Sequence, residues 1–164
     1  MTPAVRIAPA GPEDVPVILA MIKALAEYEK LAHDVVTDEA QLHESLFVQR
    51  SAEVLIGYTG GEPVGFAVYF HSYSTFLGRR GMYLEDLFVL PKWRGQGIGR
   101  ALFTRVAAIA VERGCGRMEW SVLDWNAPAI GFYKKMGARP MDEWTVFRLT
   151  GASLRDAAAG KNST

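Results

Sequence analysis

A loop with glycine at every second position is the first part of this sequence that indicates chemistry. It runs from Arg94 to Arg100 and contains Gly95, Gly97 and Gly99. Because glycine has no Cβ atom, such a loop lets backbone N–H groups converge on one anion. An amphipathic helical pattern follows, and a helix N-terminus adds unpaired N–H donors and partial positive charge. We therefore predict a loop that binds a diphosphate, with the two flanking arginines contributing charge.

Two common diphosphate loops do not match this spacing. A Walker A loop has Lys-Ser or Lys-Thr after its last glycine, whereas this loop continues with Arg100 and Ala101. The dinucleotide-binding pattern requires Gly-x-Gly-x-x-Gly, whereas the spacing here is Gly-x-Gly-x-Gly. Taken by itself, the loop is equally compatible with a plain structural turn.

Two adjacent acids interrupt an otherwise apolar strand pattern over residues 83–89. Neighbouring residues of a strand face opposite sides, so Glu85 and Asp86 are predicted to lie in different environments. A buried carboxylate is costly unless it has a hydrogen-bonding partner, contacts water or has a raised pKa. Spacing alone leaves two interpretations. Either both acids bond to the backbone at a bulge or to basic neighbours, or one of them acts on a substrate.

A second dense pattern, near the C-terminus, contains a tyrosine. Asn126 is a suitable N-cap, Pro128 suits the first turn of a helix, and Gly137 suits its end. This pattern predicts a helix over residues 128–136 that carries Tyr133. From the pattern alone, Tyr133 is either a half-buried aromatic or a phenol that serves a site.

Hydrophobic periodicity predicts the elements that position these residues, in the order strand, helices, three strands, helix, strand, helix, strand. This order is typical of an α/β fold with a mixed sheet and helices on both faces. The predicted strands are 5–8, 53–58, 63–73, 82–90, 118–122 and 144–149, with a turn at Gly60-Gly61 and a loop at 78–81. The predicted helices run from about Gly11 to Leu31, from an N-cap at Thr37, over 97–113 and over 128–136. Residues 1–150 are predicted to form one domain, and 151–164 a short helix or disordered tail.

Composition argues against several classes of function. The 164 residues include 18 basic and 18 acidic ones, so net charge gives no reason to expect binding to nucleic acid or membranes. No apolar run approaches the roughly 20 residues of a membrane span, and no signal peptide is visible, so we expect a cytoplasmic protein. The single cysteine, Cys115, excludes an internal disulfide. The three histidines lack the spacing of metal ligands, so we expect no metal.

The glycine loop and its surroundings resemble the coenzyme A motif of the GNAT superfamily of N-acetyltransferases. The stretch reads Leu87-Phe88-Val89, then Pro91-x-x-Arg94-Gly95-x-Gly97-Ile98-Gly99-x-x-Leu102. The tyrosine helix resembles the second signature of that family, and it reads Asn126-x-x-Ala129-x-x-x-Tyr133-x-x-x-Gly137. The resemblance implies the GNAT fold, a central mixed twisted sheet of six to seven strands flanked by about four helices.

The same resemblance implies acetyl-CoA as co-substrate and assigns residues around it. The backbone of 87–89 would hold the pantetheine arm, and the glycine loop would hold the diphosphate. The Tyr133 hydroxyl would face the thioester sulfur and protonate the leaving thiolate as general acid. The implied coenzyme contacts are Leu87, Phe88, Val89, Arg94, Gly95, Gln96, Gly97, Ile98, Gly99, Arg100, Asn126, Phe132 and Tyr133.

Within the superfamily, the chain is similar to the spermidine/spermine (diamine) N-acetyltransferases and leans toward their thialysine N-epsilon-acetylating branch. Residues 22–31, 65–70 and 83–86 carry the family resemblance, and residues 122–126 lean toward the branch. The resemblance implies a homodimer with substrate grooves near the subunit interface. The implied substrate contacts are Tyr28, Glu29, Glu85, Asp86 and Phe76.

One departure from that family bears on the substrate. Polyamine-acetylating members have an acid and a tryptophan where this chain has Ser74 and Phe76. A long polycation needs repeated carboxylates along its groove, and phenylalanine offers a weaker cation–π face than tryptophan. We therefore expect a shorter amine, such as a thialysine-like amino acid or a short diamine, rather than spermine.

These residues together predict direct attack of a neutral amine on the thioester. The acceptor arrives mostly as ammonium, so a base must remove its proton. We predict that Glu85 does so through water and that Asp86 positions substrate or structure. Cys115 offers no nucleophile suited to a covalent intermediate. Two other functions stay open: a non-catalytic acyl-CoA-sensing regulatory module, and an acetyltransferase that acts on protein or peptide amines.

Overall fold

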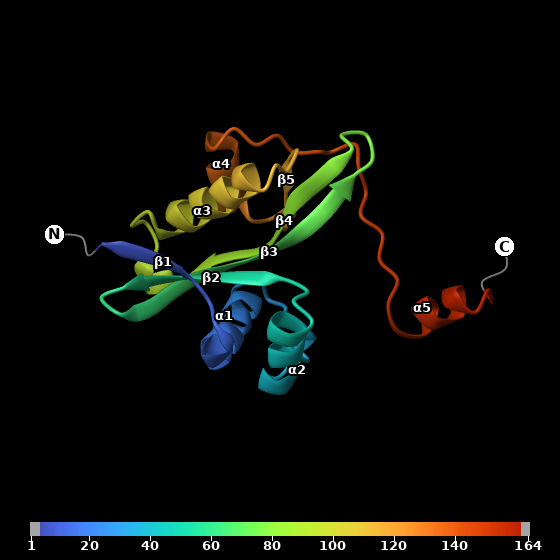
Figure 1. Ribbon diagram of the computed structural model, residues 1–164, viewed down its shortest axis with the longest axis horizontal. Helices are drawn as coiled ribbons and strands as arrows, with labels where there is room; N and C mark the ends of the chain where they lie inside the picture. Colours follow the sequence, from blue (N-terminus) through green and yellow to red (C-terminus); the bar gives the residue numbers. More distant parts are fainter. Residues whose placement is uncertain (1–3, 162–164) are drawn as a thin grey trace. The chain divides into compact units, whose positions relative to one another are not determined.

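A five-stranded mixed sheet forms the centre of the protein. The computed structural model describes residues 4–161, and Figure 1 shows the sheet with its helices. Strands β1 to β4 pair with one another in antiparallel order, and β5 runs parallel to β4. In sheet order, the strands are β1 (Val5–Pro9), β2 (Glu53–Thr59), β3 (Glu62–Ser74), β4 (Arg79–Val89) and β5 (Met118–Glu119).

Helices cover both faces of this sheet (Figure 1). Helices α1 (Val15–Tyr28) and α2 (Glu39–His43) share one apolar core with the sheet, to which α1 contributes Ile18 and the strands contribute Phe66 and Phe88. Helix α3 (Ile98–Glu112) packs on β1 to β4, and its apolar stripe includes the buried Leu102 and Val106. Shorter turns of helix are Pro12–Asp14, Ala32–Asp34, Glu44–Val48 and Pro91–Trp93.

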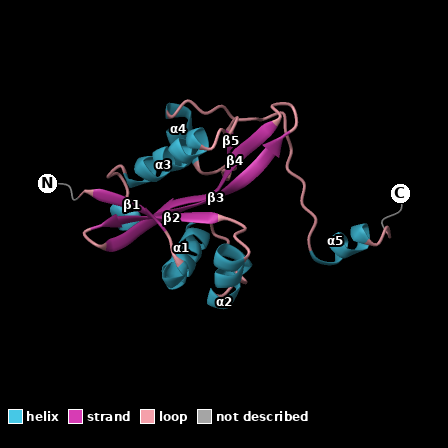
Figure 2. Cartoon of the chain, in the orientation of Figure 1, coloured by secondary structure: helices cyan, strands magenta, loops and turns pink. Residues whose placement is uncertain are grey.

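The described residues fall into two compact units. The N-terminal unit extends to Leu123 and contains the sheet with α1 to α3. The C-terminal unit begins at Asp124 and contains α4 (Ala127–Lys135) and α5 (Gly151–Ala158). Figure 2 shows irregular chain, drawn in pink, between these two helices. No helix within residues 4–161 has the length and apolarity needed to cross a membrane.

The predicted mixed α/β fold is confirmed, but the predicted number of strands is wrong. Residues 118–122 pair over Met118–Glu119 alone, and residues 144–149 form no strand in the described chain. Five strands therefore stand where six to seven were expected. Both errors concern strands whose existence depends on a neighbouring strand, which a local hydrophobic pattern does not reveal.

Several predicted boundaries also need correction. Strand β4 starts at Arg79 rather than Met82, because the chain reverses earlier, in a turn where the Ser74 hydroxyl accepts the N–H of Leu77 at 3.2 Å. The N-cap of α2 is Asp38 rather than Thr37, since the Asp38 carboxylate accepts the N–H of Gln41 at 2.8 Å. Helix α1 ends at Tyr28 instead of about Leu31. The Gly60-Gly61 turn is confirmed by positive φ at both glycines.

A two-pronged ion pair fastens the end of α3 to the sheet. The Arg113 guanidinium donates to both carboxylate oxygens of Glu53 at 2.6 and 2.8 Å, and one of its nitrogens lies 3.3 Å from the His71 ring. The hydrogen bond from Arg113 lowers the pKa of Glu53 below its ordinary value of 4.5, although partial burial opposes the shift. This pair therefore stabilises the fold above that ordinary pKa, and the stabilisation is lost as pH falls through the lowered one.

Arg113→Ala should lower the free energy of unfolding by about 1 kcal/mol at pH 7, because the pair is two-pronged yet partly exposed. The deficit should shrink in urea unfolding as pH falls through the lowered pKa of Glu53, because the carboxylate then takes up a proton and the pair is lost. Lys92→Ala is the matched control, since the ion pair of Lys92 with Glu62 is single-pronged and more exposed. An equal loss in both variants, or a deficit independent of pH, would contradict this interpretation.

Candidate active site

Strand β4 has one edge that its neighbour leaves largely unpaired. Strand β3 pairs with β4 along its length, whereas β5 pairs with it only where Met82 lies opposite Met118 and Tyr83 lies opposite Glu119. From residue 84 to 89, no strand of the described chain lies on that side of β4. Backbone N–H and C=O groups there can pair with a ligand. The predicted pantetheine-binding stretch, residues 87–89, lies within this open edge.

A β-bulge separates the two adjacent acids of β4. Leu84 lies opposite Tyr69 and Asp86 lies opposite Val68, so Glu85 is an extra residue without a partner in β3. Glu85 is exposed, whereas Asp86 is half-buried. Asp86 shares a face with Val68, which belongs to the core beneath α1 and α2. The prediction that the acids lie in different environments is confirmed.

Asp86 holds its proton to unusually high pH. Burial is the main cause, and the negative charges of Glu85 and Glu29 add to it, so the pKa of Asp86 rises to about 7. Burial also raises the pKa of Glu29, which caps the C-terminus of α1. A carboxyl that titrates near neutrality, beside two other acids, can hold or release a proton as a cation arrives or leaves.

An arginine–aromatic stack joins the end of α1 to the end of β4. The guanidinium carbon of Arg94 lies 4.3 Å from the ring centroid of Tyr28 and 5.4 Å from that of Phe88. Its Nε donates a hydrogen bond to the carbonyl of Val89 at 3.1 Å. Arg94, a predicted coenzyme contact, thus lies against Tyr28, a predicted substrate contact. Sequence reasoning missed the contact, because 66 residues separate Tyr28 from Arg94 and no local pattern links them.

The glycine loop has the conformation expected of an anion-binding turn. Gly95 and Gly97 have φ of +78° and +82°, in the region that favours glycine. A Cβ atom at either position would meet no atom within 4 Å, so backbone conformation rather than crowding requires glycine. Gly97 caps the 15-residue α3 without a side-chain hydrogen bond, and Gln96 and Arg100 are exposed beside it. The open N–H groups of the first turn fit a diphosphate.

Two of the predicted coenzyme contacts in this unit have buried side chains. Phe88 is 4% exposed and packs in the core with residues of α1, and Ile98, the first residue of α3, is 1% exposed. These side chains stabilise the fold, so contact with a ligand would come from their backbone. Gly99 lies against the Val89 side chain, where an added Cβ would be at ordinary contact distance.

The tyrosine helix of the C-terminal unit has the predicted caps. The Asn126 side-chain oxygen accepts the N–H of Ala129 at 3.3 Å, which confirms the predicted N-cap. The helix ends as predicted at Gly137, whose φ is +92°. Tyr133 is half-buried, and its ring centroid lies 5.4 Å from that of Phe132. The coenzyme contacts assigned to these residues stay predictions.

Phe76 does not lie with the other predicted substrate contacts of its own unit. It is 99% exposed in the turn between β3 and β4. Six residues of β4 separate Arg79 from Glu85, a rise of about 20 Å in a strand. A short amine at Glu85 therefore cannot reach Phe76 of the same chain. Ser74 is buried, and its hydroxyl holds this turn by accepting the N–H of Leu77.

A search of the described residues finds no group of three or more His, Cys, Asp or Glu side chains that could hold a metal ion. Cys115 is a free thiol that is partly buried at the end of α3.

Comparisons with known proteins agree with this geometry. The model of the Acetyltransferase (GNAT) family matches residues 19–138. A thialysine N-epsilon-acetyltransferase from Mus musculus is 38% identical over 93% of this chain and 96% of that protein. An L-ornithine N5-acetyltransferase from Arabidopsis thaliana is 32% identical over 92% of this chain and 86% of that protein.

A solved structure is similar over nearly the whole chain. An integron cassette protein from the mobile metagenome of V. cholerae superposes with a TM-score of 0.77 and 28% identity, over 94% of this chain and 97% of that one. The predicted family resemblance, including its thialysine-acetylating branch, is confirmed. The chain therefore belongs to the acetyltransferase (GNAT) family and is an N-acetyltransferase.

Proposed function

We propose that this enzyme moves an acetyl group from acetyl-CoA to the primary amine of a small molecule, either a thialysine-like amino acid or a short diamine or polyamine. The named activities of two relatives support this choice, because thialysine N-epsilon and L-ornithine N5 are both side-chain amine nitrogens. We further propose that the enzyme is a cytoplasmic homodimer, as its family resemblance implies.

The acids beside the open edge of β4 carry this proposal. Glu29 and Glu85 place negative charge beside the largely protonated carboxyl of Asp86, at the point where β4 loses its neighbour. Such a cluster attracts an ammonium group, and the second cationic group of a short diamine or diamino acid. A neutral substrate would gain nothing from it.

The proposed mechanism divides two proton transfers between two residues. Bound acetyl-CoA supplies an activated acetyl group as a thioester. Glu85, which the bulge exposes to solvent, accepts the ammonium proton through a water molecule and leaves a neutral amine able to attack. Tyr133 donates its phenolic proton to the departing thiolate. The open N–H groups at the start of α3 hold the diphosphate.

Release of free thiol from acetyl-CoA, followed over a panel of amines, tests the proposed function. The panel contains thialysine, ornithine, lysine, short diamines, spermidine, spermine and lysine-bearing peptides. We expect the highest kcat/KM for the short amines, with one acetyl group added by mass spectrometry. Acetylation confined to peptides would contradict the small-molecule substrate. Tight acetyl-CoA binding without turnover of any amine would identify a regulatory module instead.

Glu85→Gln should lower kcat/KM by about 10²-fold at neutral pH, because the variant cannot accept the ammonium proton. Activity should recover toward alkaline pH, where more of the amine arrives already neutral. Steady-state rates from pH 6 to 10 measure this recovery. Glu112→Gln, which alters an exposed acid at the end of α3, is the control and should match wild type. A loss that persists at high pH would assign Glu85 to positioning instead.

A further inference from the structure

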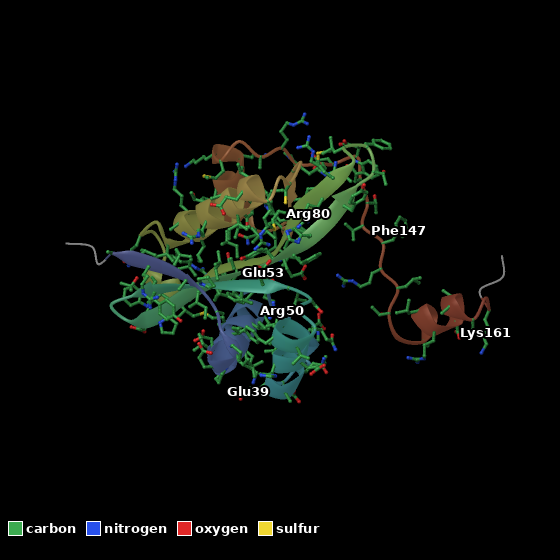
Figure 3. The ribbon with its side chains drawn as sticks, viewed as in Figure 1. Glu39, Arg50, Glu53, Arg80, Phe147 and Lys161 are labelled. Atoms are coloured by element: carbon green, nitrogen blue, oxygen red, sulfur yellow. The ribbon has the colours of Figure 1, made fainter. Side chains whose placement is uncertain are left out.

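The Arg94 side chain contacts both the end of α1 and the end of β4. Its guanidinium carbon lies 4.3 Å from the ring centroid of Tyr28 and 5.4 Å from that of Phe88. The two ring centroids are 6.2 Å apart, which is the distance of an aromatic pair. Figure 3 shows the side chains that fill the space between α1 and the sheet, the layer to which both rings belong. Arg94 itself is exposed, so its two terminal NH2 groups can still donate hydrogen bonds to an anion beside the glycine loop.

The hydrogen bond from Arg94 to Val89 ends the open edge of β4. Residues of an antiparallel strand turn their N–H and C=O groups alternately to one side and to the other. The Leu90 N–H donates to the Val64 carbonyl of β3 at 2.9 Å, so the N–H and C=O groups of Val89 point away from β3. Arg94 Nε donates to this outward Val89 carbonyl at 3.1 Å. Arg94 thus occupies the last outward acceptor of β4, and a ligand pairs with the strand only up to this point.

Tyr28 carries this link to the acid at the end of α1. It is the last residue of α1, and Glu29 follows as the C-cap, with its N–H bonded to the Leu25 carbonyl at 2.9 Å. The charge of Glu29 contributes to the raised pKa of Asp86, so Glu29 acts electrostatically on β4. Any movement of the Tyr28 ring therefore also moves Glu29, which is a predicted amine contact.

The position of Arg94 in the chain connects it to the coenzyme side as well. It directly precedes Gly95, whose φ of +78° begins the glycine loop. We infer that Arg94 is a positioning residue that couples coenzyme binding to amine binding. A coenzyme diphosphate in the loop orders Arg94, and the ordered guanidinium holds Tyr28 and Glu29 where they receive the amine. Such coupling is reciprocal, so a bound amine tightens coenzyme binding by the same factor. This role rests on the proposed acetyl transfer and adds the means by which the two substrates assist each other.

Hydrogen exchange with coenzyme A alone tests the coupling without any amine. The amides of Glu29, Lys30 and Leu31 donate to carbonyls of α1 at 2.8 to 3.1 Å. In wild type, saturating coenzyme A should slow their exchange by about 5-fold or more, because an ordered Arg94 suppresses fraying of this helix end. Arg94→Lys keeps the charge but loses the planar stack and the Nε donor, so the slowing should disappear. The amides at the start of α3 should still be protected by coenzyme A in both proteins.

Arg6→Lys is the matched control, because the Arg6 guanidinium carbon also lies 4.3 Å from a tyrosine ring, that of Tyr58. This variant should keep the wild-type response at residues 29–31. Slowing confined to the start of α3 in wild type would overturn the coupling and leave the proposed function intact, and so would equal slowing in wild type and Arg94→Lys. Unchanged exchange at both places would show that coenzyme A does not bind, and it would overturn the proposed function together with the coupling.

A double-mutant cycle on turnover tests the amine side of the coupling. With saturating acetyl-CoA and the panel amine of highest kcat/KM, Arg94→Lys should raise the amine KM about 5-fold or more and change kcat by less than about 2-fold. In a Tyr28→Leu background, which already lacks the ring, Arg94→Lys should add almost nothing. In a Tyr28→Phe background, which keeps the ring, its effect should be as large as in wild type. Fully additive effects of Arg94→Lys and Tyr28→Leu, or a loss confined to kcat, would overturn the inference.

Discussion

Replacing Tyr133 with phenylalanine should lower kcat by about 10²–10³-fold while leaving acetyl-CoA affinity unchanged. The proposed role of the phenol is to protonate a thiolate as it leaves, so its loss raises the barrier of the chemical step alone. The ring stays, and with it the packing against Phe132, whose centroid is 5.4 Å away. Thiol-release kinetics measure kcat, and calorimetry with acetyl-CoA measures binding.

Tyr73→Phe is the matched control for that experiment. Tyr73 is 67% exposed near the β3–β4 turn, and removal of its hydroxyl should change neither quantity. An unchanged kcat for Tyr133→Phe would remove this residue from the chemistry. A fall in acetyl-CoA affinity that accounts for the whole loss of rate would make Tyr133 a binding residue.

Asp86→Asn should abolish a large part of the pH dependence of stability. The pKa of Asp86 is about 7 in the folded protein and 3.8 when unperturbed. Between these values the folded state holds a proton that the unfolded chain has released. The free energy of unfolding therefore falls by about 1.4 kcal/mol per pH unit as pH rises. From pH 5 to 8, the asparagine variant should gain about 2–3 kcal/mol on wild type.

Urea unfolding at pH 5 and pH 8 measures that difference. Asp142→Asn, which changes an exposed acid of the C-terminal unit, should follow the wild-type pH dependence. Parallel pH dependences of wild type and Asp86→Asn would show that Asp86 is ionised in the folded protein at neutral pH. The acid cluster would then hold one more negative charge than its burial implies.

Local patterns were sufficient for the elements whose partners follow closely in the chain. The Gly60-Gly61 turn fixed the β2–β3 hairpin, and the apolar spacing from Ile98 located α3 to within two residues. The pattern of 144–149 predicted a strand that the structure does not contain, because the partner of such a strand does not follow closely in the chain. Its residue types favour a strand, but hydrogen bonds to a neighbouring strand decide whether one forms, and no spacing in one sequence reports them.

The candidate site was predictable to the extent that it depends on residue type. Adjacent acids within an apolar strand pointed to Glu85 and Asp86, and the alternating glycines pointed to the loop at Gly95. The bulge stayed one of two open interpretations, because it depends on pairing with β3. The stack of Arg94 on Tyr28 was out of reach, since it arises only when α1 and β4 pack together.

The incomplete ladder beside β4 links recognition to the architecture of the sheet. Strand β3 holds one side of β4 along its length, whereas β5 departs after two residues. A linear molecule with amide groups that lies in this gap occupies the position of the missing strand. Such a ligand takes the place of a strand for as long as it is bound. The backbone N–H and C=O groups of β4 that would pair with a neighbouring strand then form hydrogen bonds with the ligand.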